Sequence, residues 1–237
     1  MRSTLIRSIF IFPFLALCLM TGMPASVFSE STYVIDTPTT GMLDYGSYDL
    51  NFRLFRDGGI LPRLNFGVFK IVNLGIGWEL SRVIGDQNIT VSPPALYLKI
   101  RPYAGGIYLP ALAFGYDGQG YFFDKEKNEF LIKEKGVFVV LGREYMFPGL
   151  EFNVGANIYD FKTNTVYGFA NFIFNMEDKF MFLCEYDGIN YLPESRLNFG
   201  CRLSITDDLN IDLAGRDIGA AGRSAERILR INYLGRF

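Results

Sequence analysis

The chain has 237 residues, of which 49% are hydrophobic and 16% aromatic, and its formal net charge is −2. A charge this close to zero gives no reason to expect nucleic acid as a partner. Histidine is absent, which removes the commonest general base and the commonest metal ligand. We therefore predict no cofactor, no metal site and no enzymatic activity.

Residues 1–29 have the pattern of a secretory signal peptide. Arg2 and Arg7 precede an uncharged apolar run from Ile9 to Met20, and small residues follow it. The run is shorter than the roughly 20 apolar residues that a spanning helix needs. We expect cleavage after Ser29. Lipidation at Cys18 is the alternative, but Leu17 precedes it where a small residue is expected.

The mature chain shows no linker, and we divide it into a short periplasmic segment at 30–42 and one domain at 43–237. The domain alternates apolar and polar residues over stretches of about ten positions, separated by Gly, Asp, Asn and Pro. Twelve strands are predicted in this way: 43–55, 60–70, 73–83, 94–102, 106–117, 136–146, 149–160, 164–175, 178–188, 195–204, 208–217 and 227–237.

The predicted fold class is all-β: a single antiparallel up-and-down transmembrane β-barrel. Twelve is even, as single-chain bacterial barrels require. Ten strands are the alternative, because 136–146 is apolar on both faces and Phe169 and Ile173 blur the pattern of 164–175. The predicted connections alternate between short turns, such as 71–72, and mostly longer loops, such as 118–135, which is typical of outer-membrane barrels.

A soluble β-sandwich or periplasmic barrel would also alternate. The two kinds of protein differ in which face is apolar, because a small soluble barrel fills its interior with apolar side chains. Here Trp78 and many of the aromatic residues share the apolar face, as expected for a surface in contact with lipid. We therefore predict an outer-membrane location with lipid contact.

The polar face would line the barrel interior, with a slight excess of cations. Two interpretations stay open: a narrow pore with a basic lining that favours small acidic solutes, or charges that pair across the lumen and plug it. The candidate lining residues are Arg53, Arg63, Glu79, Lys99, Arg101, Glu151, Glu185, Asp187, Arg196, Arg202, Asp212, Arg216 and Arg230, with Asp49 and Arg236 as further members.

Three other features have both a functional and a structural interpretation. Paired carboxylates such as Glu185 and Asp187 can hydrolyse glycosides, but arginines on the next predicted strand favour ion pairs. Cys184 and Cys201 are predicted to lie roughly opposite each other, either bridged or, as we favour, free and facing lipid. The loop 118–135 would fold inward as a constriction, or extend outside as a binding surface or hairpin.

The last predicted strand places Leu229, Ile231, Tyr233 and Phe237 on one face. An aromatic residue that ends such a strand resembles the assembly signal read by the outer-membrane barrel-assembly machinery, which we expect as a partner. Gly235 departs from that signal, since an apolar side chain is usual there.

Three stretches resemble the YjbH-type outer-membrane proteins and related barrels associated with exopolysaccharide loci. They are DTPTTGMLDYGSY at 36–48, LPALAFGYDGQG at 109–120 and LNFGCRLSITDDLNIDLAGRDI at 197–218. The chain is short for that family. The resemblance implies an outer-membrane role near secreted polysaccharide and supplies no catalytic residue.

The predicted function is a narrow channel, or a component of polysaccharide export or envelope organisation. The alternatives are a closed structural barrel whose loops bind a partner or polymer, and a soluble periplasmic binding barrel. Function is inferred here from architecture, and one fold hosts many functions.

Overall fold

The computed structural model describes residues 31–237, apart from positions 87, 107, 145–148, 164, 177–178, 191–194 and 219–223. The predicted signal peptide, with Cys18 and the cleavage site, lies outside the described residues. No helix in the described part of the chain is long and apolar enough to cross a membrane.

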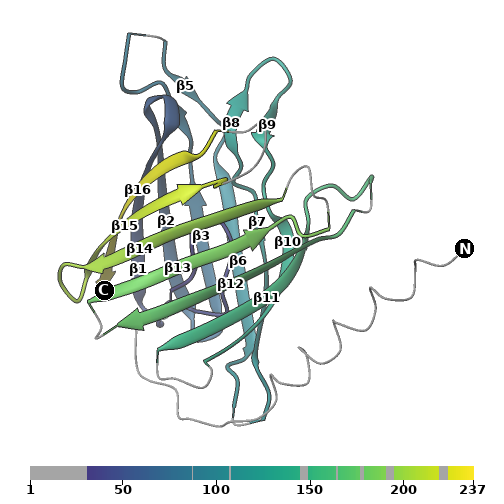
Figure 1. Cartoon of the computed structure of the whole chain (residues 1–237), viewed down its shortest axis with the longest axis vertical. Helices are drawn as coiled ribbons and strands as arrows, with labels where there is room; N and C mark the ends of the chain where they lie inside the picture. The colour runs from purple at the N-terminus through teal and green to yellow at the C-terminus, as the bar shows by residue number, and fades with distance from the viewer. Residues whose placement is uncertain are drawn as a thin grey trace, which may run out of the picture.

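Twelve long strands form one closed antiparallel barrel (Figure 1). Strands that are neighbours along the chain are neighbours in the sheet, and β1 closes it by pairing with both β2 and β16. Closure leaves the barrel wall without an unpaired edge. The barrel strands are β1 (Ser47–Phe55), β2 (Gly59–Phe69), β3 (Val72–Gly77), β6 (Ala95–Tyr103), β7 (Ala111–Asp117), β10 (Gly136–Glu144), β11 (Leu150–Ile158), β12 (Tyr167–Met176), β13 (Phe180–Asp187), β14 (Arg196–Ser204), β15 (Leu209–Arg216) and β16 (Glu226–Arg236).

The prediction of twelve strands is confirmed, and the ten-strand alternative is excluded. Most boundaries agree within a few residues. Three predicted strands are shorter than expected. The strand predicted at 73–83 ends at Gly77, and residues 80–81 belong to a separate short strand. β7 begins at Ala111 rather than 106, directly after Pro110, which has no N–H for the ladder. β1 begins at Ser47 rather than 43, because a turn at Asp44–Ser47 with Gly46 at φ +76° comes first.

Short elements lie at the end of the barrel that carries the longer loops. β4 (Leu80–Ser81) and β5 (Thr90–Val91) extend the sheet next to β2, and η1 (Arg56–Gly58) connects β1 to β2. β8 (Tyr121–Asp124) and β9 (Glu129–Ile132) form a separate hairpin. The opposite end has mostly brief turns and carries Phe237, so we take it as the periplasmic end.

The barrel wall is apolar on its outer face and polar on its inner face, which is the reverse of the arrangement in a small soluble barrel. Outward-facing Phe114, Val139 and Phe182 are more than 40% exposed, while inward-facing Lys99 and Arg216 are 0% and 1% exposed. In water such an exterior would be a very large apolar patch, whereas in a bilayer it contacts hydrocarbon. Together with the fold, this exterior places the barrel in the outer membrane and sets aside the soluble alternative.

Candidate functional site: a plugged lumen

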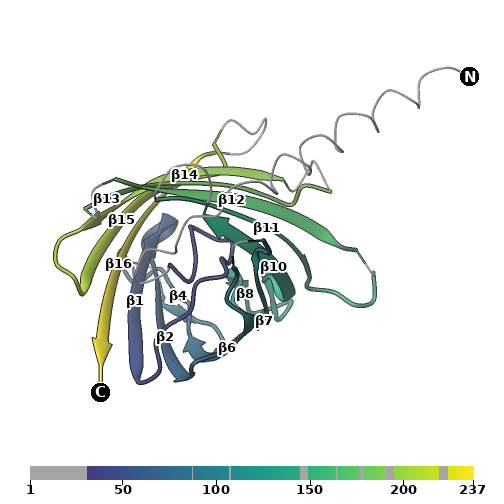
Figure 2. The ribbon, with the colours of Figure 1, turned by 90° about the horizontal axis from the view of Figure 1, so that it is seen from below.

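The lumen is occupied by residues Ser31–Leu43, which we call the N-terminal plug (Figure 2). The plug rises toward the outer end and returns, with Tyr33 bridged to Pro38 and the amide of Val34 donating to the carbonyl of Thr37. From Val34 to Leu43, only Asp36 is not fully buried. We expected a periplasmic segment at 30–42, but its described part, 31–42, is held inside the barrel.

A single carboxylate of the wall holds the tip of the plug. Glu185 on β13 accepts hydrogen bonds from the backbone amides of Ile35, Asp36 and Thr37 at 3.0, 2.9 and 2.9 Å. It also accepts from the Thr37 hydroxyl at 2.7 Å and from the Asn198 amide at 2.6 Å. Three successive amides converging on one carboxylate form a backbone anion nest, here closed by the protein itself.

Cations of the wall hold the carbonyls of the plug. The Lys99 ammonium donates to the carbonyls of Thr32, Thr39 and Gly41 at 2.7, 2.9 and 3.0 Å, which connects both arms of the plug to β6. On the other side of the lumen, Arg230 donates to the carbonyl of Val34 at 3.0 Å. Charge-assisted bonds of this kind are stronger than neutral ones, so the plug is fixed mainly through its backbone.

Asp36, at the tip of the plug, is the plug side chain that forms ion pairs with the barrel wall. Its carboxylate pairs with Arg53 at 2.6 Å and Arg216 at 3.3 Å, and accepts from the Tyr121 hydroxyl at 3.1 Å. Burial alone would raise the pKa of Asp36, but Arg53 and Arg216 outweigh burial and hold this pKa well below its usual range. Burial raises the pKa of Tyr121, in the outer hairpin, to about 12.

Apolar plug residues pack against apolar inward-facing wall residues. Val34 and Ile35 pack in a cluster with Ile173 and Leu183, and Tyr33 packs against a second cluster that contains Phe138 and Phe169. These clusters explain why 136–146 and 164–175 have apolar residues on both faces. Gly155 lies under the Phe169 ring, where a Cβ would come within 2.3 Å of a ring carbon.

The predicted lining residues, apart from Arg236, lie on the inner side of the barrel wall or at the mouth of the lumen. Arg63 pairs with Asp117 at 3.2 Å, and Arg202 pairs with Asp212 at 2.6 Å. Arg101 donates to the carbonyl of Thr40 at 3.3 Å. Fully buried members are Arg53, Glu79, Lys99, Glu185, Asp187, Arg202, Asp212, Arg216 and Arg230, and half-buried members are Arg63, Arg101, Glu151 and Arg196.

Glu79 and Arg236 lie near the two rims of the barrel. Glu79 accepts from the amide of Phe123 at 3.2 Å, and therefore lies against the outer hairpin. Arg236 is three-quarters exposed and pairs with Asp44 at the periplasmic rim, at 3.1 Å. Arg236 therefore does not line the lumen.

The carboxylates Glu185 and Asp187 are both engaged by the protein. Glu185 holds the plug, and Asp187 pairs with Lys135. Contrary to our expectation, neither pairs with an arginine of the next strand among the described residues. Glu185 accepts from Asn198 of that strand and from the plug, about 150 residues away in sequence.

The loop 118–135 combines two of its predicted roles. At its base, Tyr121 reaches inward, and the guanidinium groups of Arg53 and Arg216 each lie 4.5 Å from its ring centroid. At its tip, residues 125–128 are exposed beyond the barrel. The hairpin therefore narrows the outer mouth and also extends outside.

Cys184 and Cys201 face outward and are free. The register pairs Cys184 with Phe199 and Phe182 with Cys201, so the cysteines are diagonal neighbours rather than opposite each other. Both lie in an apolar groove of the outer surface with Phe172 and Phe180. The prediction of lipid-facing thiols is thus favoured over a bridge.

On β16, the predicted assembly residues Leu229, Ile231 and Tyr233 face outward, and the Phe237 ring stacks on that of Phe66 with centroids 6.0 Å apart. These positions form part of the apolar exterior near the periplasmic rim. Recognition by the assembly machinery stays a prediction.

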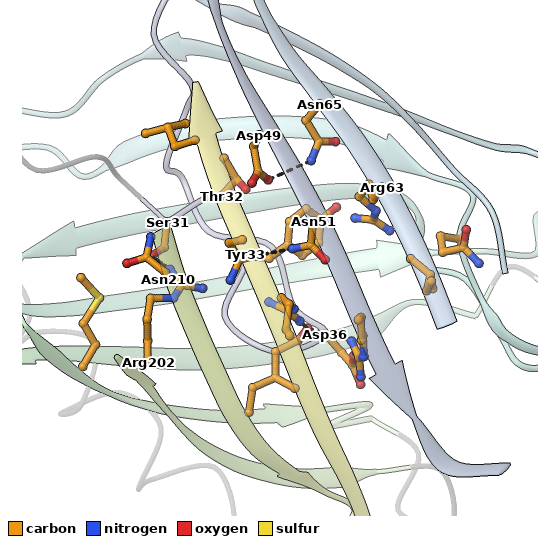
Figure 3. Close-up of a pocket in the computed structure, with 18 of the residues that line it drawn as sticks. Ser31, Thr32, Tyr33, Asp36, Asp49, Asn51, Arg63, Asn65, Arg202 and Asn210 are labelled. Atoms are coloured by element: carbon orange, nitrogen blue, oxygen red, sulfur yellow. Dashed lines mark hydrogen bonds and ion pairs between the residues drawn. The ribbon is translucent and has the colours of Figure 1, made fainter. Parts of the chain in front are cut away.

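A cavity of about 460 Å³ lies beside the plug (Figure 3). Its lining includes Asp207 from the periplasmic turn after β14 and Lys133 from the outer loop. Among the described residues that line it, eight are cationic and five anionic, a difference of three positive charges. Arg196 and Lys179 in that lining form no ion pair within the described part of the chain. The plug therefore narrows the lumen but does not fill it.

The comparisons with known proteins agree on architecture alone. No protein-family model matches the chain, and no curated protein does. Among solved structures, the chain is similar to "KdgM porin", at a TM-score of 0.57 and 9% identity, over 79% of this chain and 98% of that one. "NanC porin" matches at a TM-score of 0.43 and 11% identity, over 80% and 99%. The first similarity supports the twelve-stranded porin fold.

Proposed function

We propose that this protein is a narrow channel of the outer membrane, restricted by its own N-terminal plug, that passes small polar solutes with a weak preference for anions. The observation that carries the proposal is the cavity beside the plug, because residues from both ends of the barrel line it. Its excess of three cationic side chains supports the weak anion preference.

A closed barrel is the second candidate, and the plug contacts favour it. Glu185, Lys99 and Arg230 hold the plug backbone, and Arg63 and Lys135 are paired with carboxylates. In this case the barrel would serve as an anchor for the outer loops. The contribution to polysaccharide export or envelope organisation implied by the sequence resemblance, and binding of acidic sugars, stay predictions.

Conductance separates the two candidates. The mature chain is refolded in detergent, its folding is checked by the change of gel mobility on boiling, and single-channel currents are recorded in planar bilayers. If the protein is a channel, we expect small, stable current steps and a higher permeability to chloride than to potassium. Arg196→Glu should lower that selectivity, because Arg196 lines the cavity without an ion pair.

The matched control is Arg227→Glu, an exposed arginine on the outer surface of β16, which makes the same charge change away from the lumen. Equal effects of both variants would mean that the lumen does not set the selectivity. A folded barrel that carries no current would support the closed-barrel candidate instead.

A further inference from the structure

The cavity is lined by a band of hydrogen-bonding side chains that follows the register of adjacent strands, from the periplasmic end of β14 toward the outer end of β2. The strand register places Ser204 opposite Asn210, Asn210 opposite Asn232, Asn232 opposite Asn51, and Asn51 opposite Arg63. These five residues, which we call the polar row, come from five adjacent strands and all line the cavity. Figure 3 shows Asn51, Asn210 and Arg63 near Ser31, Thr32 and Tyr33 of the plug.

Several polar atoms in and beside the polar row lack a protein partner. Asn51 donates to the Asn232 carbonyl oxygen, which leaves the buried Asn232 Nδ2 without an acceptor. Asn65, 3% exposed, donates to Asp49 at 3.2 Å, and its buried Oδ1 accepts from no described residue. The side chain of Asn210 makes no hydrogen bond within the described part of the chain. The unpartnered atoms of Asn65 and Asn232 are fully buried, whereas the Asn210 amide lines the cavity and is open to a solute there.

The charge around the polar row selects the kind of partner. Arg63 is neutralised by Asp117, and Arg202 just above the row by Asp212. Asp49, which lines the cavity beside Asn51 and Asn65, forms no ion pair and disfavours an anion there. Amide groups supply both donors and acceptors, and a carboxylate accepts two hydroxyl protons.

We propose that the polar row binds a neutral, polyhydroxylated solute of the size and chemistry of a sugar or polyol. A ligand of this class donates to the Asp49 carboxylate and exchanges hydrogen bonds with the Asn210 amide, both of which line the cavity. A cavity of about 460 Å³ is within the size range of small-molecule sites. This inference deepens the proposed channel, because it adds a binding step on the path of the solute.

Glucose is the probe, and its binding to the refolded mature chain is measured by saturation-transfer difference NMR. The detergent is lauryldimethylamine oxide, which carries no sugar headgroup. We expect saturable binding that Asn51→Ala/Asn232→Ala weakens about tenfold, since hydrogen bonds from two amides are lost. The control is Asn157→Ala, a lumen amide that donates to the Lys135 carbonyl at 2.8 Å and does not line the cavity. It should bind as the wild type does.

If the double variant fails the mobility test for folding, Asn210→Ala replaces it, because that side chain has no protein hydrogen bond to lose. Absence of glucose binding, or binding that the row variants leave unchanged, would overturn the proposal. Tighter binding of glucuronate than of glucose would overturn the neutral ligand class.

Conductance keeps this test separate from the proposed function. A chain that conducts but does not bind glucose remains a channel without the polar-row site. A chain that binds glucose at the row without conducting has the site inside a closed barrel.

Discussion

The two sides of the barrel interior bind the plug in different ways. On β6, β7, β10 and β12 the inward side chains include Tyr97, Ala113, Phe138 and Phe169, which form an apolar cluster against Tyr33. From β14 to β2 most inward side chains are charged, amide-bearing or hydroxyl-bearing, although Ile228 and Leu61 are apolar, and the cavity lies there. The apolar side packs on the plug by burial, which needs close contact, while the polar side leaves room for solute. The N-terminal plug therefore fills one side of the lumen and lines the cavity on the other side.

The largest expected effect on stability comes from removing a side chain of the apolar cluster that packs against Tyr33. Phe169→Ala removes a fully buried ring next to Tyr33 and Gly155, and should lower the free energy of unfolding by about 3–5 kcal/mol. The measurement is urea unfolding in detergent micelles. Phe199→Ala, on the outer surface, is the matched control and should cost far less, since detergent or lipid is as apolar as the ring. Equal costs would mean that the apolar cluster does not anchor the plug.

The next largest effect on stability is expected at Glu185, the carboxylate that holds the tip of the plug. Glu185→Gln keeps the shape of the side chain but removes the charge that accepts three plug amides, so we expect a loss of about 2 kcal/mol and more frequent current fluctuations. Glu129→Gln, in an exposed pair with Lys133, should change stability by at most about 0.5 kcal/mol. Unchanged stability and current after Glu185→Gln would contradict the role of Glu185 in holding the plug backbone.

Much of the barrel could be predicted from the sequence, because alternation with period two reports directly on a wall with two faces. The segment 136–146 was predicted as a strand although it is apolar on both faces, and it forms β10. The plug could not be predicted, because it does not alternate and its contacts join residues such as Ile35 and Glu185 that are far apart in sequence. The one indication of the plug in the sequence was the presence of apolar residues, Phe138, Phe169 and Ile173, at inward positions of the wall.

Asp36 should make the stability of the folded protein depend on pH. Its pKa is held below the usual range by Arg53 and Arg216, despite burial, so its stabilisation is fully present above the unfolded pKa of about 4 and is lost as the pH falls through the lower folded value. We expect this loss to begin below about pH 4. Asp36→Asn should be less stable at neutral pH and should show a weaker acid dependence. The same acid dependence in both proteins would assign it to other carboxylates.

The smallest effect is expected on the cavity side. Asn210→Ala removes a half-buried amide with no protein hydrogen bond, and should change the free energy of unfolding by at most about 0.5 kcal/mol. Urea unfolding in the same micelles gives the comparison with Phe169→Ala. A cost near that of Phe169→Ala would mean that the two sides of the interior support the plug alike.

The most direct test of the account is the conductance of a chain that lacks residues 31–42, recorded beside the full mature chain once both pass the mobility test for folding. We expect current steps several times larger after the deletion, because the segment occupies the lumen between β6 and β16. Equal conductance from two folded barrels would contradict the central claim that the N-terminal segment restricts the channel.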